Sequence, residues 1–75
     1  MRKTAESVLE DAREKNEPVF VLRGQDECAI EAIQAYLVAC VSQRCDPFHI
    51  SGVHDILRDF VQFSENHPGR MKKPD

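Results

Sequence analysis

A chain of 75 residues has room for one small domain, here residues 1–75, in which residues 67–75 form a basic C-terminal tail. Its composition, 41% hydrophobic and 31% charged, is that of a chain that folds. With 13 acidic against 10 basic residues the net charge is -3, which argues against a general nucleic-acid or membrane-surface binder. A core of this size contributes only about 3–5 kcal/mol, so we expect a further source of stability.

Cysteine usage and hydropathy indicate where the protein acts. Three cysteines, Cys28, Cys40 and Cys45, cannot all pair within one chain, and residues 1–25 are charged where a signal peptide would be apolar. The longest nearly apolar stretch, residues 35–41, is too short to cross a bilayer. We therefore expect a reducing compartment and a cytoplasmic protein that does not bind membranes.

The first helix is predicted at residues 4–16, with Thr4 as its N-cap. Its apolar stripe is thin, because it consists of Ala5, Val8, Leu9 and Ala12. Pro18 disfavours helical geometry at the residue before it and ends the helix.

An extended segment is predicted at about residues 18–23, and it is the most unusual feature of the chain. Val19, Phe20, Val21 and Leu22 are apolar without interruption, so both faces of the segment need cover and its backbone needs hydrogen-bond partners. Two outcomes are open: the segment pairs with its copy in a second subunit, or it lies unpaired across the helices. Gly24 gives freedom to turn, and Asp26 is placed to accept hydrogen bonds where the next helix begins.

The second helix is predicted at about residues 27–44, with a core stripe of Ala29, Ile33, Tyr36, Leu37 and Cys40. Apolar side chains continue around most of its second half, which is typical of a helix buried on all sides. Two small neighbouring helices cannot enclose it. We therefore predict a subunit interface formed by Val19, Phe20, Val21, Leu22, Ile30, Leu37, Val38 and Val41.

The third helix is predicted at about residues 52–66, because Asp46 and Pro47 interrupt helical structure before it. Its apolar side consists of Val53, Ile56, Leu57, Phe60 and Phe63. The sequence His67-Pro68-Gly69 ends this helix. The fold class that follows is mainly α, with three helices and one extended segment between the first and the second.

Two groups of residues carry chemistry of their own. Cys40, Cys45, His49 and His54 are zinc-ligand types, but their spacing lacks the short Cys-x2-Cys element, so we predict no metal and no cofactor. Cys45 with His49 could form a nucleophile and base, although no orienting third residue is identifiable, and we predict no enzyme.

Arg23 and Gly24 precede the start of the second helix, where free N–H groups attract anions. With Lys72 and Lys73 of the tail they are candidates for binding a nucleotide-like anion. Internal capping at Arg23 and a solvated tail are the alternatives.

The motif Phe20-Val21-Leu22-Arg23-x-x-Asp26, a helix with Tyr36, then Phe60-x-x-Phe63 and a closing Lys73-Pro74-Asp75 resemble small accessory proteins encoded by phages and mobile elements. The resemblance implies action by binding, as inhibitors or sponges in conflict between phage and host, and small oligomers. It carries over no catalytic residue.

We therefore expect a non-enzymatic binding protein that forms a homodimer or a higher homo-oligomer. The alternatives are a regulator that covers a larger host protein, a small-ligand binder, and a structural zinc module.

Overall fold

The computed structural model describes residues 4–74 and consists mainly of three helices. They are α1 (Ala5–Glu14), α2 (Ala29–Ser42) and α3 (Pro47–Asn66), and a short 3-10 helix, η1 (Pro68–Arg70), follows. The chain between α1 and α2 is extended, and no strand forms in the described part of the chain. The predicted fold class is confirmed.

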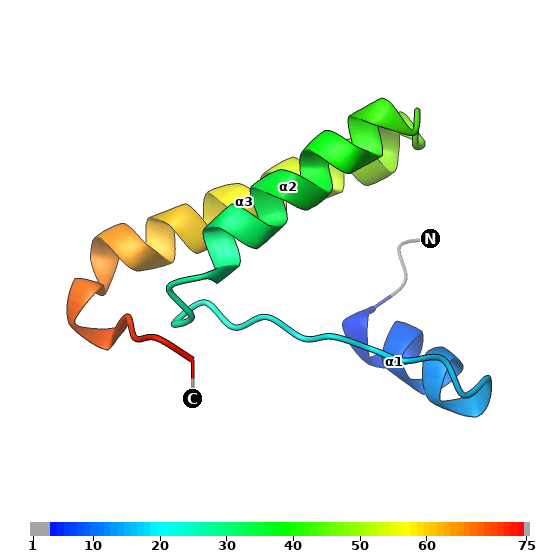
Figure 1. The fold of residues 1–75 in the computed structure, drawn as a ribbon, viewed down its shortest axis with the longest axis horizontal. Helices are drawn as coiled ribbons and strands as arrows, with labels where there is room; N and C mark the ends of the chain where they lie inside the picture. The colour runs from blue at the N-terminus through cyan, green and yellow to red at the C-terminus, as the bar shows by residue number, and fades with distance from the viewer. Residues whose placement is uncertain (1–3, 75) are drawn as a thin grey trace.

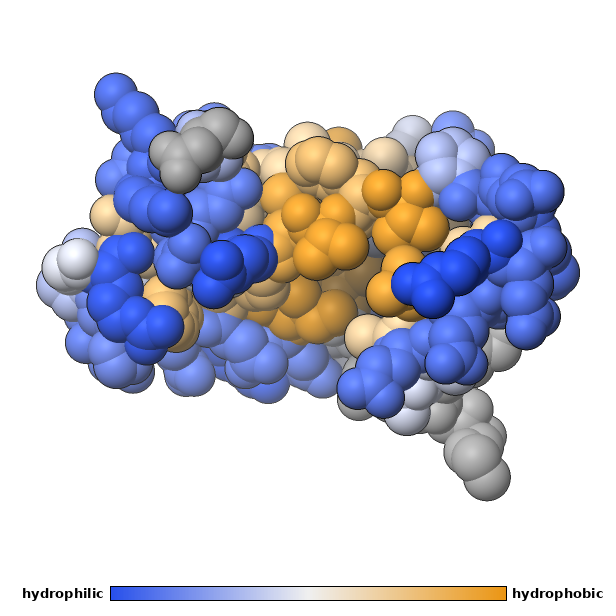
Figure 2. Space-filling model, turned by 90° about the horizontal axis from the view of Figure 1, so that it is seen from below, coloured by the Kyte–Doolittle hydropathy of each residue, from blue (hydrophilic) through white to orange (hydrophobic). Residues whose placement is uncertain are grey.

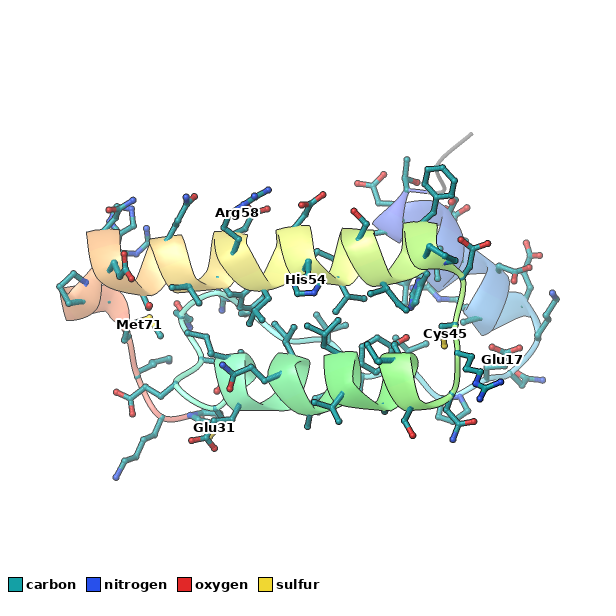
Figure 3. All side chains as sticks on the ribbon, turned by 90° about the horizontal axis from the view of Figure 1, so that it is seen from above. Glu17, Glu31, Cys45, His54, Arg58 and Met71 are labelled. Carbon is teal, nitrogen blue, oxygen red and sulfur yellow. The ribbon has the colours of Figure 1, made fainter. Side chains whose placement is uncertain are left out.

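Helices α2 and α3 form an antiparallel hairpin and lie side by side along their lengths (Figures 1 and 3). The core of the hairpin is small: Ala29, Ile33 and Cys40 of α2 and Val53 of α3 are buried. No large side chain in residues 4–74 is fully buried. Tyr36, predicted to be part of the core stripe, is 52% exposed, because α2 has a neighbour on one side only.

The start of α3 differs from the prediction. The helix begins at Pro47, and the Asp46 carboxylate accepts a hydrogen bond of 2.8 Å from the Phe48 N–H. Proline fits the first turn of a helix, because the N–H that it lacks would have no partner there. Asp46 and Pro47 therefore begin α3, and Gly52 lies inside this helix.

The first two helices end with the same turn. Asn16 and Arg44 follow them with φ of 56° and 55°, in the left-handed region. After α2, the N–H groups of Arg44 and Cys45 donate to the carbonyls of Val41 and Cys40. After α1, Asn16 and Glu17 donate to Arg13 and Ala12 in the same pattern. This hydrogen-bond pair is the Schellman motif, which usually has glycine at the left-handed position.

Helix α1 of the N-terminal arm, which we define as residues 4–23, does not pack on the hairpin. Helix α1 lies apart from α2 and α3 in Figure 1, and no residue of α1 approaches another helix. As predicted, Thr4 caps α1, since its Oγ1 accepts a hydrogen bond from the Ser7 N–H at 3.0 Å. Ala12 is the one buried residue among those of α1.

The C-terminal tail is tied to the start of α2 and is more than a solvated extension. Asp26 and Lys72 form an isolated parallel bridge, in which the Lys72 N–H donates to Gln25 and the Glu27 N–H donates to the Lys72 carbonyl, both at 2.9 Å. The Arg70 guanidinium lies 4.9 Å from the centre of the Phe63 ring. These contacts fold the tail back against the open end of the hairpin (Figure 1).

Gly24 lies in a turn, as predicted, but its φ is not positive, so the turn does not require glycine. A Cβ at this position would lie 3.4 Å from the Phe63 ring, which is an ordinary van der Waals contact. The ring therefore packs against Gly24 without excluding a small side chain.

Candidate functional site

Three regions of the structure contain the residues that the sequence singled out: the exposed apolar surface, a pocket beside the tail, and a cluster at the tip of the hairpin.

The predicted interface residues form the first region, and many of them are exposed. Phe20 is 84% exposed, Val21 70% and Val38 69%, and Val19 and Val41 are also open to solvent. Leu22, Ile30 and Leu37 are half-buried. Figure 2 shows apolar side chains gathered across the middle of one face, with polar side chains at both ends. The chain alone therefore leaves most of this surface uncovered.

The backbone of the extended segment also lacks partners. Residues 18–22 make no backbone hydrogen bond to any other part of residues 4–74. The N–H and C=O groups on either side of this segment are therefore available for pairing with another strand.

The total surface is large for the mass of the chain. The structure exposes 6442 Å², whereas a compact folded monomer of 8.6 kDa exposes about 4,700 Å². Even full exposure of the four residues outside the described range would account for only about 800 Å². The radius of gyration is 13.7 Å, against about 11 Å for a compact domain of this length. An excess of about 1,000 Å² therefore remains.

The second region is a pocket with a volume of about 260 Å³, between the extended segment and the tail. It is lined by Val21, Arg23, Gln25, Asp26, Lys72 and Pro74. The bridge between Asp26 and Lys72 brings together two of the four predicted ligand-binding residues, Arg23 and Lys72. The other two do not line it: Gly24 packs against Phe63, and Lys73 is exposed.

The electrostatics of this pocket are mixed. Arg23 makes no hydrogen bond or ion pair with the side chains of residues 4–74, so its guanidinium is available to a ligand. Asp26 places a carboxylate in the same lining, and its Oδ1 accepts a hydrogen bond of 2.7 Å from the Cys28 N–H, as its predicted role at the start of α2 implies. The carboxylate offsets part of the positive charge.

The third region, the tip cluster, consists of Tyr36, Cys40, Cys45 and His49, where α2 turns into α3. Tyr36 Oη and His49 Nε2 lie 2.9 Å apart and share a hydrogen bond, with the rings edge to face. Cys40 is buried and Cys45 is half-buried. Figure 3 shows Cys45 in the turn that joins the two helices.

The pKa values of Cys45 and Tyr36 in the tip cluster are both raised. The hydrogen bond to Cys40 raises the pKa of the Tyr36 hydroxyl, and burial adds to the effect. Burial raises the pKa of the Cys45 thiol, and its hydrogen bond to Cys40 acts in the same direction. Sequence reasoning missed the Tyr36–His49 contact, because the two residues belong to different helices.

Metal-binding chemistry has no assembled site within residues 4–74. No three histidine, cysteine or acidic side chains in this range come together to hold a metal ion. His54 lies on α3 beyond the tip cluster, and Figure 3 shows it well away from Cys45. Within the same range, no helix combines the length and apolar character needed to cross a membrane.

Known proteins provide no guide to function. No family model, curated protein or solved structure matches this chain. The functional argument therefore depends on the residues and their geometry.

Proposed function

We propose that this chain is a small, non-enzymatic binding protein that acts as a homo-oligomer, with a homodimer as the simplest form. Two observations carry the proposal together: the exposed apolar side chains, with Phe20, Val21 and Val38 among them, and the excess of total surface. This excess of about 1,000 Å², polar and apolar surface combined, is larger than the roughly 800 Å² that each partner buries in a standard interface. The size of the uncovered surface therefore matches the requirement of a stable dimer.

A second copy of this chain is the partner that fits best. The unpaired backbone of residues 18–22 is its own complement, because two copies related by a twofold axis can pair as antiparallel strands. The exposed row on α2, with Val38 and Val41, then offers cover for the apolar side chains of the other arm. The same pairing would supply the stability that the small core lacks.

The class of protein follows from the resemblance in sequence. It favours an inhibitor or accessory factor of a phage or mobile element, and the odd number of cysteines favours the cytoplasm. The raised pKa of the Cys45 thiol favours a role without catalysis, because a nucleophilic cysteine needs a lowered pKa. A larger host protein as the natural partner is the competing interpretation.

Size-exclusion chromatography with light scattering tests the oligomer. We expect a mass of twice 8.6 kDa or more at micromolar concentration. A stable monomer would contradict the proposal and leave the host protein as the partner to seek. Val38→Glu and Phe20→Glu should each weaken the dimer about 30-fold or more, because each buries an unpaired charge in the interface.

Phe48→Glu is the matched control for the two interface variants. Phe48 is 89% exposed but lies at the tip of the hairpin, outside the predicted interface. This variant should keep the mass of the unmodified protein. Dissociation by Phe48→Glu, with no effect of Val38→Glu, would move the interface to the tip.

A second candidate function is the binding of a small anion, such as a nucleotide phosphate. Arg23 and Lys72 lining one pocket of about 260 Å³ favour it. Inorganic phosphate and adenosine monophosphate are the probes, and an increase in thermal midpoint that disappears in Arg23→Ala would support binding. Arg58→Ala is the control, since Arg58 forms a surface ion pair with Asp55 on α3.

A further inference from the structure

The turn after α2 holds two cysteines side by side. Arg44 takes the left-handed position, and the Cys45 N–H donates to the Cys40 carbonyl at 3.0 Å. In a Schellman motif the residues joined by this hydrogen bond usually pack their side chains together. Here both of those residues are cysteine.

The two thiols are also close enough to influence each other. Cys40 contributes to the raised pKa of Cys45 and to the raised pKa of Tyr36. Only 3% of the Cys40 surface is exposed, whereas Cys45 is half-buried and reachable from solvent. Cys28, the remaining thiol, precedes the start of α2 and is therefore at the opposite end of this helix.

We propose that Cys40 and Cys45 form an oxidation site, which a hydroperoxide such as hydrogen peroxide converts to a disulfide across the end of α2. The modification depends on the fold and is independent of the oligomeric state.

The reaction has two steps, and Cys45 reacts first because it is the accessible thiol. Its thiol first loses its proton to solvent, the thiolate sulfur attacks one peroxide oxygen, the O–O bond breaks, and the departing hydroxide takes up a proton to form water. Cys45 is then a sulfenic acid. The Cys40 sulfur attacks the Cys45 sulfur, the S–O bond breaks, and hydroxide leaves with the Cys40 proton as a second water. Two thiols lose two electrons in total, and one peroxide gains them.

The surroundings of Cys45 determine how the rate depends on pH. Because the thiolate is the attacking species and the pKa of Cys45 is raised, oxidation should be slow near neutral pH. Its rate should rise about tenfold per pH unit until the pH reaches that pKa. A rate that does not change with pH would contradict attack by Cys45.

Tryptic mapping gives a direct test, because Arg44 separates the two cysteines. Trypsin cleaves after Arg23, Arg44 and Arg58, so Cys40 and Cys45 fall in adjacent peptides, 24–44 and 45–58. The full-length Cys28→Ser variant is treated with hydrogen peroxide, digested without reductant and analysed by mass spectrometry. We expect the two peptides to remain joined and to separate on reduction. Separate peptides with alkylatable thiols after peroxide treatment would overturn the proposal.

Two further variants assign the order of the steps. Cys40→Ser in the Cys28→Ser background should leave Cys45 as a sulfenic acid that dimedone traps, because the resolving thiol is gone. Cys45→Ser in the same background should give no adduct, since Cys40 is buried. A non-reducing gel of the oxidised Cys28→Ser protein should show single chains. Linked chains in place of single ones would mean that the disulfide forms between copies, which contradicts an intrachain site.

Discussion

The hairpin and the N-terminal arm contain similar local signals, but a second helix packs on the first only in the hairpin. Each contains a helix that ends in a left-handed turn, at Asn16 in the arm and at Arg44 in the hairpin. After Arg44, Asp46 and Pro47 start a new helix at once, and α3 folds back onto α2. After Asn16, Pro18 begins an extended run that carries α1 away from any neighbouring helix.

The difference shows what makes an amphipathic stripe bury itself. The apolar stripe of α2 packs on α3 because the connection is short and the next element is again a helix. No helix folds back to cover the apolar stripe of α1, and Val8 is 50% exposed. A stripe predicts a buried face, but the connection decides whether the same chain covers it.

The largest expected effect separates the core of the hairpin from its surface. Ile33→Ala should cost about 2–5 kcal/mol, because Ile33 is only 8% exposed and its loss leaves a cavity between α2 and α3. Ile56→Ala is the matched control, since Ile56 is 49% exposed, and it should cost under about 1 kcal/mol. Denaturant unfolding followed by circular dichroism measures both. Equal costs would mean that Ile56 is covered in solution.

The second test compares the helix caps of the two regions. Asp46→Ala removes the acceptor of the Phe48 N–H and should lower the global stability by about 1 kcal/mol. Thr4→Ala removes the equivalent cap of α1. In the isolated chain it should reduce helicity and leave the unfolding midpoint of the hairpin unchanged, because α1 does not pack on it. A large loss of stability with Thr4→Ala would show that α1 is docked, either on the hairpin or on a second copy.

The third test uses the two left-handed residues. Arg44→Gly should stabilise the hairpin by about 0.5 kcal/mol, because glycine removes the strain of a positive φ at some cost in unfolded-state entropy. Asn16→Gly should change little, since asparagine tolerates this conformation better than arginine. Thermal unfolding of the two variants side by side provides the measurement. A larger gain in stability from Asn16→Gly than from Arg44→Gly would contradict this expectation.

The smallest effect is the response of the tip cluster to alkaline pH. The pKa values of Cys45 and Tyr36 are both raised in the folded state, so folding favours their protonated forms. This contribution is complete below the unfolded pKa values, about 8.5 for cysteine and about 10 for tyrosine, and is lost as pH rises through the folded ones. Between about pH 8 and pH 11 the thermal midpoint should therefore fall more steeply in the native protein than in a Cys45→Ser, Tyr36→Phe variant. Parallel curves would contradict the raised pKa values of Cys45 and Tyr36.

Local signals predicted much of the fold. Thr4 as a cap and the end of α3 at His67 are each set by neighbours within a few residues, and the structure has both. Helix α1 ends at Glu14, through the left-handed turn at Asn16, before Pro18 is reached. The start of α3 was predicted wrongly, because Asp46 and Pro47 are signals for both an end and a beginning. Which of the two applies depends on the Asp46 carboxylate reaching the Phe48 N–H.

The candidate sites could be predicted only in part. The sequence indicated Arg23 and Lys72 as basic residues, but the bridge at Asp26 that brings them to one pocket is a contact between distant segments. Cys40 and Cys45 were visible as a pair of thiols. Their contact depends on the left-handed conformation of Arg44, which arginine rarely adopts and which no local preference would suggest.

The sequence by itself determined the helices, their caps and the apolar character of residues 19–22, because these depend on side-chain periodicity and on hydrogen bonds between near neighbours. Only the tertiary structure decided that α2 pairs with α3 while α1 stands apart, that the tail returns to Asp26, and that two thiols meet at the tip. The physical reason is that packing depends on where each connection directs the next element. That direction is a property of the folded chain as a whole.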